Sequence, residues 1–210
     1  MTAIRELPED YRRVGTLDLR NDRTARSISF ALRMLTLVVF VPLFAGVAWV
    51  IRPEIRRDPA VLWNLGGGEF PAILIYLALG ALIIAMLILH ELVHLAVFRL
   101  SGAGDSRIGV NGFAVFAWAD GWYTRRGAMV LNAAAPFFVI SAVGVSLFPL
   151  VSAEYFGWVY LPVVINAAVA AGDYMGIAWL LMVPRGAWIS DEGETLTAYA
   201  PVLTDEESVQ

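Results

Sequence analysis

Four stretches of this chain are long and apolar enough to cross a lipid bilayer, and they constrain its fold more than any other feature. They run from about residue 28 to 51, 71 to 100, 128 to 151 and 158 to 183. A hydrocarbon core about 30 Å thick needs roughly 20 apolar residues of helix. The apolar fraction of the 210 residues is 59% and the charged fraction is 16%, whereas soluble domains have about 45–50% and 25%. The sequence therefore predicts an all-α membrane protein with about four transmembrane helices.

The distribution of arginines predicts the orientation of these helices. Eleven arginines lie in the segments that share a side with the N-terminus, against three in the connection between the first and second runs. Cytoplasmic loops of membrane proteins carry the excess of basic residues. We therefore predict a multi-pass protein of the cell membrane with both termini in the cytoplasm. Cytoplasmic segments 1–27 and 184–210, the second of them acidic, would flank a transmembrane domain at 28–183.

The connection between the second and third runs, residues 101–127, carries the signals of β structure. Asn111-Gly112 and Asp120-Gly121 are two-residue turn signals, and short apolar and aromatic runs at 108–110, 113–118 and 122–123 surround them. This pattern predicts a small hairpin or three-stranded meander. The alternative is an interfacial loop that only anchors the chain.

The acidic tail gives a weaker signal. Residues 188–190 and 195–199 could form the arms of a short hairpin around Asp191-Glu192-Gly193-Glu194. We nevertheless expect a solvated and partly ordered tail.

The second apolar run contains the pentapeptide His90-Glu91-Leu92-Val93-His94, which holds both histidines of the chain. Residues four apart share one face of an α-helix, so the two imidazoles could bind one Zn²⁺. Glu91 beside them would act as a general base toward a zinc-activated water. Ionisable groups inside an apolar helix are costly unless they face a bundle interior or bind a metal. The alternative is a pair of buried histidines bonded to backbone carbonyls.

A catalytic zinc site needs a third protein ligand, and the chain has no cysteine to supply one. Asp173 is the only acidic residue of the fourth run, and we expect it to be the third ligand. Gly172 and Gly176 flank it in a G-x-x-x-G pair that permits close helix approach. Asp173 could instead be a neutral packing residue, and Asp120 is a weaker rival ligand.

These residues resemble two families. The His90–His94 motif within a span, the later Asp173, and Asn132-Ala-Ala-Ala-Pro136 resemble the site-2 protease group of intramembrane zinc metalloproteases. A closer resemblance, over about residues 89–199, is to the small membrane proteins called putative zincin peptidases. Site-2 proteases proper carry a proline-rich run before an Asp-Gly pair, whereas here no proline separates Asn166 from Gly172-Asp173-Tyr174.

The resemblance implies a role for each matching residue. His90, His94 and Asp173 would be the ligands of one zinc ion, and Glu91 would be the catalytic acid and base. Asn166 would lie near the substrate carbonyl and take part in catalysis. The region between the second and third runs would present a strand edge to an extended substrate.

We therefore expect an intramembrane zinc metalloprotease that hydrolyses peptide bonds of membrane-associated proteins. Its expected partners are a membrane protein or peptide substrate and the lipid bilayer, with no nucleic acid. Two alternatives are a divalent-metal transporter and a non-catalytic membrane scaffold that contains zinc. The single polar cluster and the lack of internal repeats count against a transporter. The retention of Glu91 counts against a purely structural zinc site.

Overall fold

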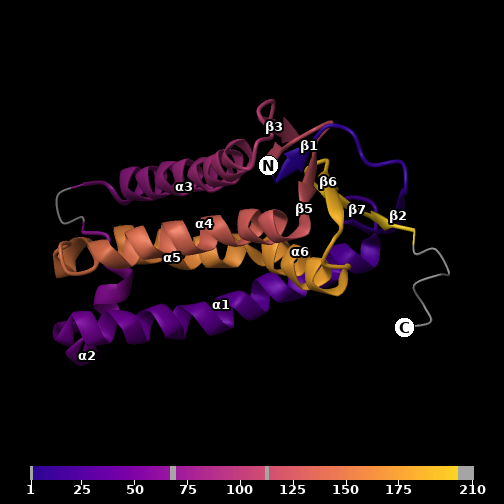
Figure 1. Ribbon diagram of the computed structural model, residues 1–210. Helices are drawn as coiled ribbons and strands as arrows, with labels where there is room; N and C mark the ends of the chain where they lie inside the picture. The colour runs from indigo at the N-terminus through magenta and orange to yellow at the C-terminus, as the bar shows by residue number, and fades with distance from the viewer. Residues whose placement is uncertain (1, 67–69, 112–113, 203–210) are drawn as a thin grey trace. The chain divides into compact units, whose positions relative to one another are not determined.

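The computed structural model describes residues 2–66, 70–111 and 114–202, and most of them are helical (Figure 1). The helices are α1 (Arg23–Ile51), α2 (Pro53–Arg57), α3 (Ala72–Leu100), α4 (Arg126–Leu147), α5 (Gly157–Val169) and α6 (Ala171–Met182), with 3-10 turns η1 (Pro59–Trp63) and η2 (Ala153–Tyr155). The strands are β1 (Ala3–Ile4), β2 (Tyr11–Asp18), β3 (Arg107–Asn111), β4 (Ala114–Trp118), β5 (Tyr123–Arg125), β6 (Trp188–Asp191) and β7 (Thr195–Pro201).

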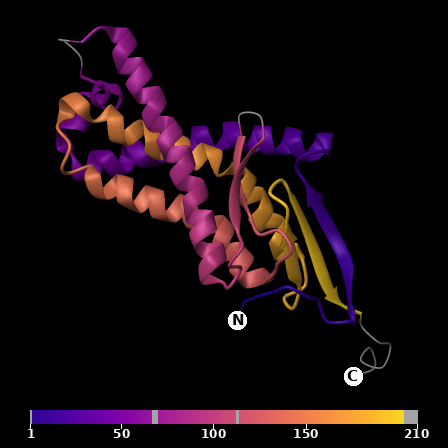
Figure 2. The same cartoon turned by 90° about the horizontal axis from the view of Figure 1, so that it is seen from above.

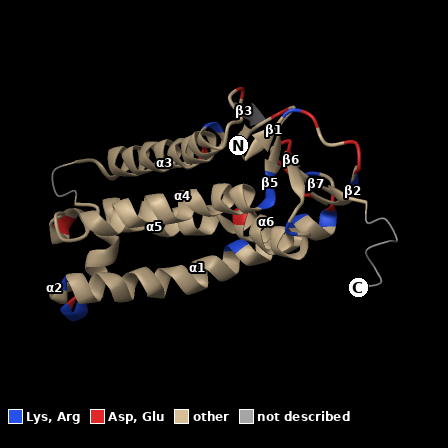
Figure 3. Cartoon of the chain, in the orientation of Figure 1, with Lys and Arg blue, Asp and Glu red and all other residues tan. Residues whose placement is uncertain are grey.

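Four helical segments are long and apolar enough to cross a membrane, as predicted. They are α1, α3, α4 and the stretch Gly157–Met182, which contains α5 and α6. Figure 3 shows that these segments carry few charged residues along their length. Only 6% of the most apolar window of α3 is buried in the protein, which leaves a large apolar surface exposed. The four segments are compatible with a multi-pass membrane protein.

The fourth segment is not one continuous helix. It is interrupted at Ala170, between α5 and α6, where the backbone has φ −63° and ψ 4°. The interruption needs no proline, although a proline usually marks such a break. Its consequence is that Asp173 lies in the first turn of a new helix, α6.

The chain forms two compact units. The first, which we call the sheet unit, contains Met1–Ser29, Glu91–Ala135 and Asp173–Gln210, and the second, the helical unit, contains Phe30–His90 and Pro136–Gly172. The chain passes from one unit to the other within helices α1, α3, α4 and α6.

The helical unit packs around large aromatic side chains. Phe148, Phe156 and Tyr160 are fully buried in its core, together with Phe44 of α1. The Tyr160 hydroxyl donates a hydrogen bond of 2.8 Å to the Val41 carbonyl. This bond satisfies the one polar atom of a ring that otherwise contributes apolar area.

The sheet unit is built on a five-stranded antiparallel sheet with the order β1-β5-β6-β7-β2, seen from two directions in Figures 1 and 2. Strands from the two ends of the chain pair directly, as in Thr16 of β2 opposite Thr197 of β7. Ile189 of β6 and Ala198 of β7 are fully buried in the core of this unit. The expectation of a solvated tail is therefore wrong for residues 188–201, which form a hairpin within the sheet. The fold is helix-rich with small sheets rather than purely α.

The region between α3 and α4 forms a two-stranded hairpin, not a three-stranded meander. Strand β3 pairs with β4 over Arg107–Asn111 and Ala114–Trp118. The expected third strand, β5, pairs instead with β1 on one edge and β6 on the other. With both edges used, β5 cannot also pair with β4. Of the predicted turn Asn111-Gly112, Gly112 lies outside the described part of the chain and Asn111 ends strand β3. Gly121 of the second predicted turn adopts a φ of +69° that suits glycine.

Candidate metal centre

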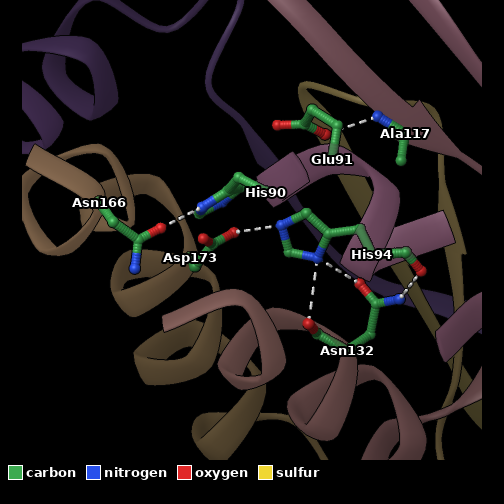
Figure 4. Close-up of polar contacts among 7 residues, drawn as sticks. All are labelled: His90, Glu91, His94, Ala117, Asn132, Asn166 and Asp173. Atoms are coloured by element: carbon green, nitrogen blue, oxygen red, sulfur yellow. Dashed lines mark hydrogen bonds and ion pairs between the residues drawn. The ribbon is translucent and has the colours of Figure 1, made fainter. Parts of the chain in front are cut away.

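The motif His90-Glu91-Leu92-Val93-His94 lies in the C-terminal half of helix α3. Its two histidines project from one helical face because they are four residues apart. The ligand atoms of His90, Glu91 and His94 all lie within 4.8 Å of one another. His90 and His94 are only 4% and 8% exposed, respectively. Among the described residues this cluster could bind a metal ion, and Figure 4 shows the polar contacts around it.

Asn132 of α4 orients the imidazole of His94. The Nδ1 atom of His94 lies 3.0 Å from the backbone oxygen of Asn132 and 3.0 Å from its side-chain Oδ1. The amide orientation of Asn132 is fixed, because its Nδ2 donates to the backbone oxygen of His94 at 2.9 Å. Both atoms near Nδ1 are therefore acceptors, so the ring carries its proton on Nδ1 and turns Nε2 toward the other side.

On that other side, Nε2 of His94 lies 3.4 Å from Oδ1 of Asp173. Two oxygen acceptors thus face Nδ1 while a carboxylate faces Nε2. A single ring proton serves only Nδ1, so the close approach of Nε2 and Oδ1 requires a second proton or a metal cation between them. Two ligands that bind one zinc ion at about 2.0–2.1 Å in tetrahedral geometry lie at about this separation. The donor set therefore fits zinc.

The start of helix α6 also favours a negative charge on Asp173. The residue lies in the first helical turn, immediately after the interruption at Ala170. The positive end of the helix dipole stabilises a carboxylate at this place. This position would suit Asp173 as an anionic partner for a cation, which is the predicted role.

His90 has its own amide partner. The Nδ1 atom of His90 lies 3.0 Å from Oδ1 of Asn166, which is fully buried in α5. With the amide in this orientation, Nδ1 of His90 donates to Oδ1, so Nε2 would be the atom that binds a metal. The Nδ2 atom of Asn166 is buried and has no hydrogen-bond partner among the described residues. An ordered water or a ligand would satisfy a buried donor of this kind.

Glu91 is held by the β3–β4 hairpin. Its Oε2 accepts a hydrogen bond of 2.8 Å from the backbone N–H of Ala117 on β4. One carboxylate oxygen of Glu91 is thus held by a strand, while the residue still offers a ligand atom within 4.8 Å of those of both histidines. This arrangement is compatible with the predicted role of Glu91 as a base. Asp120, the rival ligand, is exposed. Neither Asp120 nor Asp173 belongs to the cluster found among the described residues, but Asp173 lies beside His94.

Asp191, at the end of β6, is a buried acidic residue within electrostatic reach of the motif, which sequence reasoning missed. Its carboxylate is buried, and its Oδ1 accepts a hydrogen bond of 2.7 Å from Gly193 N–H. Burial raises the pKa of Asp191 to about 7. The charge of His94 lowers this pKa, and the carboxylates of Asp173 and Glu91 raise it further. The electrostatic field of the motif therefore reaches the C-terminal hairpin.

The contacts that Asn132 and Ala117 make with the motif could not be predicted from the sequence. Asn132 was noted only as part of a resemblance, because its contact with His94 depends on how α3 and α4 meet. Ala117 acts through its backbone N–H, which no side-chain pattern reveals. Asp191 resembled an ordinary turn residue in an acidic tail.

A buried His-Glu-His cluster on an apolar helix, with an aspartate beside the second histidine, is the arrangement of a metallopeptidase of the HExxH type. The chain belongs to the family described as "Putative zincin peptidase", whose match covers residues 83–188, half of its length. It has no match among curated proteins or among solved structures. Family and cluster together indicate a zinc metallopeptidase, while the roles of the individual residues stay predictions.

The contact of Asn132 with His94 makes a prediction about metal affinity. Asn132→Ala removes Oδ1 from His94 Nδ1 and leaves only the backbone oxygen to orient the ring. Loss of such an outer partner typically weakens metal binding by about 10–100-fold, and we expect the lower end because the backbone contact survives. The measurement is competition for zinc against a chelator in detergent. Ser141→Ala, another buried polar position on α4, should bind zinc like the wild type. Unchanged affinity in Asn132→Ala would refute the orienting role.

Proposed function

We propose that this protein is an intramembrane zinc endopeptidase of the site-2 protease type, which cleaves peptide bonds of membrane-associated proteins. The observation that best supports this proposal is the environment of His94, because both nitrogens of its ring face oxygen acceptors. The motif lies in a helix apolar enough to span a bilayer, which supports chemistry at membrane depth. In this proposal zinc is held by His90, His94 and Asp173.

The bound zinc would supply a Lewis acid that polarises the scissile carbonyl and acidifies water. Glu91 would take the proton of the attacking water on its carboxylate and later transfer it to the nitrogen of the leaving amine. Asn166 would donate from Nδ2 to the substrate carbonyl oxygen as negative charge develops there. The buried, unsatisfied Nδ2 supports this assignment. His90 would be oriented by Oδ1 of the same amide.

The outer edge of β4 would bind the substrate backbone. In an antiparallel pair, hydrogen-bonded and non-hydrogen-bonded residue pairs alternate. Ala117 pairs with Ile108, but its N–H donates to Glu91, so this pair is non-hydrogen-bonded. It follows that the main-chain groups of Val115 and the carbonyl of Ala117 also face away from β3. An extended peptide could add to this edge as a strand. A transmembrane helix would have to unwind locally to do so.

The function predicts a defined effect of Glu91→Gln. The amide has the size of the carboxylate but cannot accept the proton of water, so hydrolysis should fall by about 10²–10⁴-fold. Zinc content should stay at the wild-type level, because Glu91 is not a ligand in this proposal. The measurement is mass-spectrometric detection of products from a set of synthetic single-span peptides in detergent micelles with added zinc. Cleavage by Glu91→Gln at the wild-type rate would refute the proposal.

We also propose that both termini are cytoplasmic, on the distribution of arginines. The natural chain has no cysteine, so single introduced thiols report topology without background. A membrane-impermeant maleimide should label Glu154→Cys, in the connection between α4 and α5, in intact cells. It should label Glu9→Cys only after permeabilisation. The reverse labelling pattern would invert the orientation.

A further inference from the structure

The hydrogen bond between Glu91 and Ala117 joins the C-terminal half of helix α3 to strand β4. Oε2 of Glu91 accepts the N–H of Ala117 at 2.8 Å, with the donor 26 residues further along the chain. Glu91 is half-buried and Ala117 is buried. Figure 4 shows the Glu91 side chain reaching toward the strand. Hydrogen bonds to a carboxylate are among the stronger ones in proteins, and they fix its direction well.

A glutamate side chain is flexible, so a base built from it needs an external restraint. When one carboxylate oxygen is anchored, rotation of the terminal group is restricted and the other oxygen takes a fixed position. The anchor comes from the backbone of a paired strand, which cannot change rotamer as a side chain could. A fixed base is what proton transfer at a precisely placed water needs.

The same strand offers its outer edge to an extended peptide. The N–H of Ala117 is occupied by Glu91, and the next outward-facing residue is Val115. Two strand residues span about 7 Å. A peptide laid along β4 would therefore meet the base near Ala117 and make main-chain hydrogen bonds about two residues away, at Val115.

We propose that Ala117 is a positioning residue for Glu91 and that strand β4 thereby aligns the base with the peptide bound on its edge. The role rests on the proposed function, since it assumes that Glu91 is the base. It goes further by assigning two different tasks to two neighbouring backbone groups. The N–H of Ala117 sets the position of the base, and the N–H of Val115 sets the register of the substrate.

Proline substitutions separate these tasks, because they remove one N–H and leave the strand ladder intact. The N–H of Ala117 and that of Val115 both face away from β3, so neither is needed for the hairpin itself. Ala117→Pro should lower kcat by about 10²-fold, the scale of a misplaced catalytic group, with KM and zinc content near wild type. Val115→Pro should instead raise KM with little change in kcat.

Ile108→Pro is the matched control. Ile108 lies directly opposite Ala117 on β3, and its N–H faces the outer edge of β3, away from Glu91. The substitution places proline at the same depth of the same hairpin. It should leave kcat, KM and zinc content unchanged. If Ile108→Pro lowers kcat as much as Ala117→Pro does, the effect is general damage to the hairpin, and the positioning role is refuted.

A spectroscopic readout tests the contact without activity. In protein labelled with ¹⁵N-alanine, the Ala117 amide is assigned by its disappearance in Ala117→Gly. Its proton should resonate downfield in the wild type and move upfield in Glu91→Gln, because a neutral amide is a weaker acceptor than a carboxylate. If the chemical shift of the Ala117 amide proton is the same in Glu91→Gln as in the wild type, the inference is refuted, whatever the activity of the variants.

The kinetic outcomes distinguish the inference from the function on which it rests. Loss of kcat in both Glu91→Gln and Ala117→Pro supports the positioning role. If Glu91→Gln is inactive while Ala117→Pro keeps the wild-type kcat, the proposed function stands and the positioning role fails. If Glu91→Gln remains active, the function itself fails, and with it the role of Ala117.

Discussion

The imidazole of His94 lies between oxygen acceptors on both of its ring nitrogens, and the other parts of the site follow from this constraint. Asn132 determines which nitrogen carries the proton, and Asp173 lies close to the nitrogen that does not. Inside an apolar helix, a neutral ring beside a carboxylate calls for one positive charge between them, and a zinc ion would supply it. The charges of His94, Asp173 and Glu91 also shift the pKa of the buried carboxylate of Asp191, which lies outside the helix on strand β6.

The local structure around this ring explains several features of the fold that have no other evident purpose. The interruption at Ala170 places Asp173 at the beginning of a helix, where a carboxylate is stabilised by the dipole. The β3–β4 hairpin anchors one carboxylate oxygen of Glu91 beside the two histidines. Strands from both ends of the chain take part in the five-stranded sheet, and one of its strands, β6, carries Asp191. Segments far apart in sequence thus supply one electrostatic environment.

Local sequence patterns predicted the helices and the motif well. Apolar runs of more than 20 residues locate the four helical segments, and the spacing of His90 and His94 places both on one face. Asp173 could be named because it is the only acidic residue of its segment, and it lies beside His94. The pairing of β2 with β7 could not be predicted, since it joins residues such as Thr16 and Thr197 from opposite ends of the chain. The backbone donor at Ala117 and the second β contact of β5 likewise depend on tertiary packing that no short pattern encodes.

Zinc stoichiometry of the purified protein tests the central claim most directly. Elemental analysis of chelator-free protein in detergent should find about one zinc per chain in the wild type, with the metal lost or greatly weakened in His94→Ala and Asp173→Ala. Asp120→Ala, which removes an exposed carboxylate, should keep the full amount. A wild-type protein that binds no zinc, even when zinc is supplied, would contradict the account. So would an Asp173→Ala variant that binds zinc as tightly as the wild type.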